Sequence, residues 1–338
     1  GYTVLGGFLA VSTTDLIQSI VMSIALVVIV FFGIQQAGGW DVVMQNASAL
    51  PGYLNLAQGH NMATGEAATY GALSIVSTLA WGLGYFGMPH ILLRFMAIRD
   101  ENKLKISRRI ASVWVIISMF VAILIGIIGY SVSLNGKIPV FSSSAESETV
   151  IVQLADLLSR HGVFFALTAG VVLAGILACT MSTADSQLLT AASSVSQDLL
   201  QDFFHVRMSE GASMLVARGT VIAIALVSVV LAWDPNSSVF TIVSFAWAGF
   251  GAAFGPVMLF ALFWKRSNKW GALAGMITGG VMVFVWKYLV RPIGGAWNIY
   301  ELLPAFLVAC VAIVAVSLAT ASPAQDICDE FDAVKAVR

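Results

Sequence analysis

Long apolar runs alternate with short polar segments along the whole chain. A helix that crosses a bilayer needs about 20 consecutive, mostly apolar residues. This criterion predicts about eight membrane-spanning helices, at about 9–34, 71–95, 110–133, 161–191, 214–233, 238–264, 271–290 and 302–321. The alternating segments of about 10 residues that are typical of membrane β-barrels do not recur, so we expect an all-α integral membrane protein.

Composition excludes a soluble globular domain. Of the 338 residues, 59% are hydrophobic and only 10% are charged, whereas a soluble domain carries about 25% charged residues. The 17 basic and 18 acidic residues nearly balance, so no basic excess points to nucleic acid. The three cysteines, Cys179, Cys310 and Cys328, lack the spacing of a disulfide framework or a zinc site.

The distribution of lysine and arginine predicts the orientation of the spans, because cytoplasmic loops carry an excess of these residues. Most of them lie in one alternate set of loops, with a concentration between Arg94 and Arg109, whereas the loop at 35–70 has none. We therefore expect a multi-pass protein of the cell membrane with a cytoplasmic C-terminus. The loops at 35–70 and about 134–160 are expected on the external side.

The second span carries residues that interrupt helices. Proline lacks an amide donor and clashes with the preceding turn, and glycine lowers the cost of leaving helical geometry. Four such residues lie close together here: Gly82, Gly84, Gly87 and Pro89. Unwound backbone at membrane depth is tolerated only inside the protein or along a cavity, and secondary transporters use such breaks to bind substrates and ions. The pattern predicts a broken helix near mid-membrane.

Trp81, Tyr85 and Pro89 follow one another at intervals of four residues, which places them on about one face of a helix. The two aromatic rings are suited to form a wall or lid over a ligand. The alternative is a proline-kinked helix with packed aromatic side chains, because membrane helices use glycine and proline often.

The fourth span combines small residues with a polar cluster. Ser182 and Ser186 are one turn apart, and Thr183 follows Ser182. Hydroxyl and carbonyl oxygens suit a hard monovalent cation such as sodium. The alternative is that these hydroxyls bond back to their own helix and pack helices together. That alternative does not explain Asp185, since an ionisable group inside a span is costly and usually functional.

A second carboxylate, Asp15, lies near the cytoplasmic end of the first span. It is interpreted as a group that helps an ion to leave or that pairs with Arg94, or else as a partly hydrated residue at the membrane interface. The four histidines are scattered without metal-binding spacing, and no nucleotide-binding or nucleophile motif is present. The sequence therefore predicts no enzyme and no metal or cofactor site besides a site for sodium.

Five segments resemble the sodium:solute symporter family, and within it the proline-transporting branch. They are GGFLAVSTTD (6–15), WGLGYFGMPHILLRF (81–95), LACTMSTADSQLL (177–189), SFAWAGFGAAFGPVMLF (244–260) and WKRSNKWGALAGMITGG (264–280). The resemblance implies an all-α, LeuT-type inverted-repeat transporter. It also implies that about eight of roughly thirteen helices are present and that the chain is truncated at its N-terminus.

The resemblance further implies a division of the chain. It assigns 1–34 to the last helix of inverted repeat one, 35–70 to an external loop, 71–264 to the five helices of inverted repeat two (the first broken near Gly82–Pro89), 265–321 to two peripheral helices and 322–338 to a cytoplasmic tail.

Site residues are carried over position by position. The resemblance implies sodium binding by Ser182, Thr183 and the backbone carbonyl of Cys179, substrate binding by Trp81, Tyr85 and Pro89, and ion coupling by Asp15 and Arg94. Met88 stands where a proline-transporting member has glutamine, and Asp185 receives no ligand role.

The implied function is sodium-coupled uptake (symport) of L-proline or a similar small amino acid by alternating access across the lipid bilayer. It involves no enzyme activity, nucleic acid or cofactor beyond the coupling ion. The alternatives are a symporter of another solute, such as a different amino acid, pantothenate or a sugar acid, and a transporter-like membrane sensor domain.

Overall fold

The computed structural model describes residues 2–62, 64–98, 100–233 and 238–336. Helices dominate, and seven helices of this described part are long and apolar enough to cross a membrane. They cover Leu9–Ala37, Glu101–Leu134, Val163–Phe203, Glu210–Leu231, Val239–Phe263, Lys269–Ile293 and Leu302–Ala319. The protein is an all-α, multi-pass membrane protein, as the hydrophobic pattern predicted.

The segment expected to be the second span is not one long helix. It consists of α3 (Ala72–Leu79), the 3-10 helix η1 (Ala80–Gly87) and α4 (Pro89–Met96). Each piece has 8 residues, which is far below the about 20 that a spanning helix needs. The count of long apolar helices is therefore seven in the described residues, because glycine and proline interrupt this segment.

The chain forms two compact units, and each unit combines three stretches that are separate in the sequence. The first comprises residues 1–54, 60–67 and 98–238, and the second comprises 55–59, 68–97 and 239–338. The strands β1 (Gln58–His60) and β2 (Ala67–Thr69) form a two-stranded sheet.

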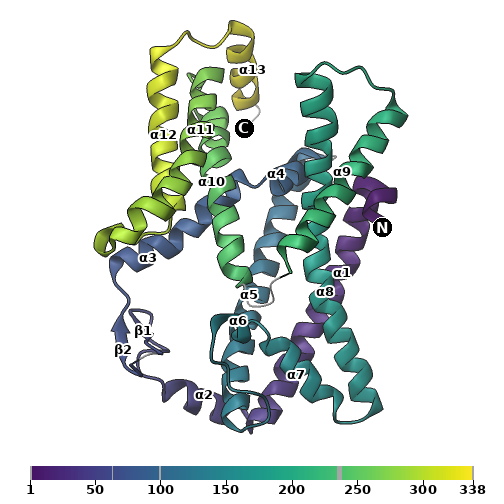
Figure 1. Cartoon of the computed structure of the whole chain (residues 1–338), viewed down its shortest axis with the longest axis vertical. Coiled ribbons are helices and arrows are strands. Elements are labelled where there is room, and N and C mark those ends of the chain that lie inside the picture. The colour runs from purple at the N-terminus through teal and green to yellow at the C-terminus, as the bar shows by residue number, and fades with distance from the viewer. Residues whose placement is uncertain (1, 63, 99, 234–237, 337–338) are drawn as a thin grey trace. The chain divides into compact units, whose positions relative to one another are not determined.

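The first unit is built mainly from four long helices. Its elements are α1 (Tyr2–Ala37), α2 (Trp40–Ser48), η2 (Glu101–Lys103), α5 (Leu104–Leu134), α6 (Ser144–Ser147), α7 (Val150–Ser159), α8 (Val163–Ser193), the π-helix η3 (Ser194–Phe203) and α9 (Glu210–Leu231). α1 lies along α8 and also contacts α5 (Figure 1). Small residues allow the close approach, because a Cβ on Gly175 would lie 2.7 Å from the Cβ of Ala25.

The second unit groups three spanning helices around an alanine-rich core. Besides α3, η1 and α4 it contains α10 (Val239–Phe263), α11 (Lys269–Val285), η4 (Trp286–Val290), η5 (Arg291–Ile293), η6 (Gly295–Trp297), α12 (Leu302–Ala319) and α13 (Gln325–Ala336). α11 packs against both α10 and α12 (Figure 1). Ala248, Ala252 and Val283 are completely buried there.

Asn268 joins the start of α11 to the end of α12. Its Oδ1 accepts a hydrogen bond from the Gly271 amide at 2.9 Å, and its Nδ2 donates to Thr320 Oγ1 and to the Ala321 carbonyl, both at 2.8 Å. The residue therefore caps one helix and holds the C-terminal end of another.

We expect Asn268→Ala to destabilise the folded protein by about 1–2 kcal/mol, because the cap and the two further bonds are lost together. The measurement is thermal unfolding of the purified protein in detergent. Ser209→Ala is the matched control: Ser209 caps α9 through one exposed bond to the Ala212 amide at 3.3 Å. An equal or larger loss in the Ser209 variant would contradict this role of Asn268.

Candidate functional site

The interrupted segment of the second unit is the first candidate site. The 3-10 helix η1 ends at Gly87, and Met88 follows in an extended conformation (φ −80°, ψ 111°). Pro89 then opens α4 at its first turn, where the missing amide donor costs nothing. The chain thus leaves α-helical geometry over the residues in which glycine and proline are concentrated.

Glycines let η1 lie directly against α10. A Cβ on Gly87 would overlap the Phe250 carbonyl oxygen and would lie 2.7 Å from the Gly255 amide nitrogen. A Cβ on Gly251 would likewise lie 2.7 Å from the Cα of Gly84. Backbone therefore packs on backbone at this contact, which only residues without a side chain allow.

Aromatic rings surround Trp81 at the start of the 3-10 helix. Its ring is stacked with those of Phe240, Trp247 and Tyr300, with centroids 5.6, 5.5 and 6.0 Å away. Trp247 Nε1 also donates a hydrogen bond to the Trp81 carbonyl at 2.9 Å. Trp81 is therefore fixed through both its ring and its backbone.

Tyr85 lies one turn further on. Its ring packs in a T-shaped arrangement with the Trp247 ring, with 4.8 Å between the two centroids, and its side chain is half-exposed. The structure thus brings Trp81 and Tyr85 together around Trp247, while Pro89 lies at the start of the next helix. Sequence periodicity identified Trp81 and Tyr85 but not Trp247 or Tyr300, because those two rings come from distant parts of the chain.

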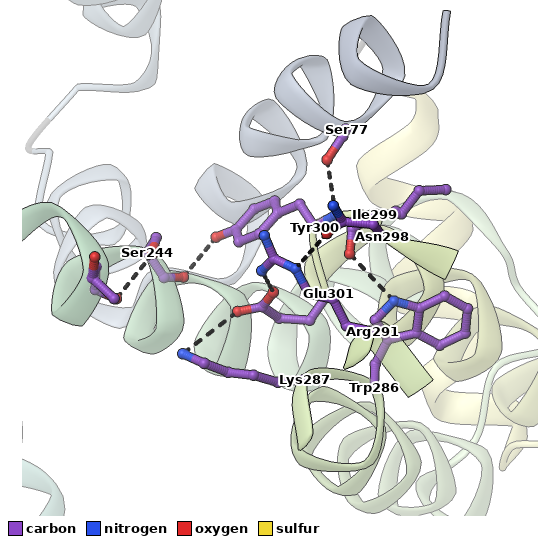
Figure 2. A network of polar contacts seen from close by, with 10 residues as sticks. Ser77, Ser244, Trp286, Lys287, Arg291, Asn298, Ile299, Tyr300 and Glu301 are labelled. Carbon is purple, nitrogen blue, oxygen red and sulfur yellow. Dashed lines mark hydrogen bonds and ion pairs between the residues drawn. The ribbon is translucent and has the colours of Figure 1, made fainter. Parts of the chain in front are cut away.

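Tyr300 belongs to a polar network shown in Figure 2. Its amide donates to Ser77 Oγ at 2.8 Å, and its hydroxyl donates to the Ser244 carbonyl at 2.6 Å. Burial, followed by the negative charge of Glu301, raises the pKa of the Tyr300 phenol above its ordinary value of 10.0. The phenol therefore stays protonated at neutral pH and remains a hydrogen-bond donor.

The hydroxyl cluster of α8 lies in the first unit. Ser182 Oγ donates to the Cys179 carbonyl at 3.0 Å, Ser186 Oγ donates to the Ser182 carbonyl at 3.0 Å, and Thr190 Oγ1 donates to the Ser186 carbonyl at 2.8 Å. Each hydroxyl that bonds to its own helix keeps lone pairs that can face a cation. Thr183 and Cys179 are exposed and Ser182 is half-buried.

Two charged residues complete the set predicted from the sequence. Asp15 is half-buried on α1, the helix that packs along α8, and Arg94 is exposed in the last turn of α4. Asp185 is 7% exposed on α8. Among the described residues, no group of three histidine, cysteine, aspartate or glutamate side chains is placed to hold a metal ion.

The spanning helices, the interrupted segment and the clustered aromatic and hydroxyl side chains of the described residues define a multi-pass integral membrane protein with a broken helix. The profile of the sodium:solute symporter family matches residues 1–279. The chain therefore belongs to the sodium:solute symporter family.

Relatives extend along nearly the whole chain. This chain is 39% identical to the high-affinity proline transporter PutP of Bacillus subtilis, over 98% of this chain and 65% of that protein. It is also 39% identical to the sodium/proline symporter of Haemophilus influenzae, over 98% of this chain and 64% of that protein. The chain thus spans about two thirds of the length of these relatives.

A solved structure shares the fold. It is a Na⁺-coupled sialic acid symporter in a substrate-bound outward-open state, with a TM-score of 0.70. The two chains are 18% identical, and the match covers 96% of this chain and 65% of the other. This likeness confirms the LeuT-type fold that the sequence resemblance implied.

Proposed function

We propose that the protein is a symporter that takes up L-proline, or a similar small amino acid, together with sodium across the cell membrane. The observation that carries the proposal is the break formed by η1, Met88 and Pro89, with stacked aromatic rings at its start. Transporters of this architecture bind their solutes at such breaks. Relatives named as proline transporters support the choice of solute.

The proposed substrate site consists of Trp81, Tyr85 and Pro89. An apolar, ring-lined wall suits the pyrrolidine of proline, while backbone groups freed at the break suit its charged ends. No catalytic step and no cofactor is assigned to these residues, since the protein moves its solute unchanged.

The proposed sodium site consists of the hydroxyls of Ser182 and Thr183 and the carbonyl of Cys179. Oxygen ligands without a full charge suit a monovalent hard cation. Asp15, inside α1, and Arg94, in the last turn of α4, are proposed to act in ion coupling through their charges.

Coupling is thermodynamic in this proposal. Sodium and solute each favour the conformation to which they bind better, and each raises the affinity for the other by the same factor. The membrane potential adds about 2.3 kcal/mol per charge per 100 mV to the sodium gradient. Alternating access then releases both ligands on the cytoplasmic side.

The proposed orientation follows the positive-inside rule. It places the C-terminus in the cytoplasm and the connection between α11 and α12 on the external side. In the same proposal, residues 1–34 close inverted repeat one, 71–264 form inverted repeat two and 265–321 form the peripheral helices.

Counterflow of labelled L-proline into proteoliposomes tests the proposal, with the protein expressed at full length. We expect uptake with sodium and none when potassium replaces it. Protein-free liposomes are the control for leakage. Sodium-independent uptake would contradict the coupling, and the absence of uptake of any amino acid would contradict the function.

A different small solute is the second candidate, and Met88 is the observation that favours it. Met88 lies at the break and its thioether offers no hydrogen-bond donor, unlike the glutamine of a proline-transporting member. Competition by unlabelled amino acids, pantothenate and a sugar acid in the same counterflow assay distinguishes the candidates.

A further inference from the structure

The connection between α11 and α12 contains a buried carboxylate held by two cations. The Glu301 side chain is only 2% exposed, and its Oε2 lies 2.9 Å from Arg291 Nη1 (Figure 2). Its Oε1 lies 3.9 Å from Lys287 Nζ. A buried carboxylate without partners is strongly destabilising, so Glu301 must keep its contacts with Arg291 and Lys287. These contacts tie the beginning of the connection to its end.

Further contacts fix the same connection. Arg291 Nε donates to Asn298 Oδ1 at 3.1 Å, and Trp286 Nε1 donates to the Ile299 carbonyl at 3.2 Å. The Lys287 ammonium lies 3.8 Å from the centre of the Phe245 ring on α10, a favourable cation–π arrangement. The backbone at residue 300 is therefore held from several directions.

Tyr300 lies at the end of this fixed connection, and it contacts the interrupted segment at Ser77 and Trp81. Its amide and hydroxyl are bonded to Ser77 and Ser244, as described above, so the ring has two anchors. The ring lies 6.0 Å from that of Trp81 with an angle of 17° between the planes. The Trp81 ring is thus in contact with a residue more than 200 positions away in the sequence.

We propose that Tyr300 is a positioning residue for the solute site: Glu301, with Lys287 and Arg291, fixes the connection, and Tyr300 holds the Trp81 ring in the orientation that receives the solute. This inference rests on the proposed function, which places Trp81 at that site. It assigns part of the solute affinity to the peripheral helices.

The test is the kinetics of sodium-driven uptake by the full-length protein, using the solute that the wild type takes up. We expect Tyr300→Leu to raise the KM for the solute about 5- to 10-fold, because the stacking contact with Trp81 and the hydrogen bond to the Ser244 carbonyl are both lost. Tyr300→Phe keeps the ring and should raise KM only about 2- to 3-fold. In both variants kcat, per transporter in the membrane, should stay within about twofold.

Tyr288 provides matched controls in the same connection. Its ring contacts those of Phe245 and Phe284, so Tyr288→Leu and Tyr288→Phe should leave KM unchanged. Glu301→Gln should raise KM as Tyr300→Leu does. Should that variant fail to fold, the Tyr300 pair still decides the question, because Tyr300 carries no buried charge.

The outcomes separate this inference from the proposed function. If the wild type takes up its solute with sodium and Tyr300→Leu has an unchanged KM, the positioning role is wrong and the proposed function stands. A fall in kcat with unchanged KM in Tyr300→Leu overturns it as well, since it would indicate a structural role only. If the wild type takes up no solute with sodium, the proposed function fails, and this inference fails with it.

Discussion

Replacing both Ser182 and Thr183 by alanine is expected to raise the sodium concentration for half-maximal uptake by about 100-fold. Each substitution removes one oxygen from the proposed sodium site. A hydrogen bond to a charged group contributes about 1.5–3 kcal/mol, and each 1.4 kcal/mol corresponds to about tenfold in affinity. The measurement is the initial rate of solute uptake in proteoliposomes as a function of external sodium.

The helix itself should tolerate the double substitution, because alanine is the best helix former and both positions lie inside α8. Thr168→Ala is the matched control, since Thr168 is on the same helix and its hydroxyl donates to the Phe164 carbonyl at 2.9 Å. It should leave the sodium dependence unchanged. An unaltered half-saturating sodium concentration in the double variant would show that sodium binds elsewhere.

Gly87→Ala should prevent stable folding of the second unit or destabilise it by about 3 kcal/mol or more. The added methyl group would overlap the Phe250 carbonyl oxygen and lie 2.9 Å from the Cα of Gly251. These are backbone atoms of α10, which cannot rotate away as a flexible side chain would. Overpacking of this kind typically costs about 1–3 kcal/mol and more where the surroundings are rigid.

Gly82→Ala separates the clash from a general effect of losing glycine in this segment. Among the described residues, no atom other than those of its chain neighbours and of its own helix backbone lies within 4 Å of a Cβ built on Gly82, so alanine should be accommodated there. The measurement is the fraction of monodisperse protein after heating in detergent. Equal stability of the Gly87 and Gly82 variants would contradict the close packing of η1 on α10.

Much of the fold was predictable because bilayer thickness sets a length that hydrophobic runs must match. Glycine and proline also marked the segment in which the structure has a 3-10 helix and an extended Met88. Seven of the expected spans are continuous long helices in the described residues, and the remaining one is the segment that glycine and proline divide into α3, η1 and α4, as predicted. The π-helical ends of α8 and α11 left no recognisable pattern in the sequence.

The surroundings of the candidate sites were harder to predict. Trp81 and Tyr85 stood out by their spacing, but the stacking of Tyr300 on Trp81 joins segments with no periodic relation to each other. The burial of Glu301 against Lys287 and Arg291 was also hidden, since an ion pair within a short connection leaves no periodic pattern in the sequence. The roles of Ser182, Thr183, Cys179, Asp15 and Arg94 remain predictions.

The glycine contact between η1 and α10 has a consequence for conformational entropy. Glycine has no rotamers, so the contact of Gly84 and Gly87 with Gly251 and Gly255 immobilises no side chain at these positions. A shift of η1 along α10 would exchange one set of backbone van der Waals contacts for another and would leave the rotamer entropy at the contact unchanged. The free energy of such a movement would then be set by backbone geometry and by the rings that surround Trp81.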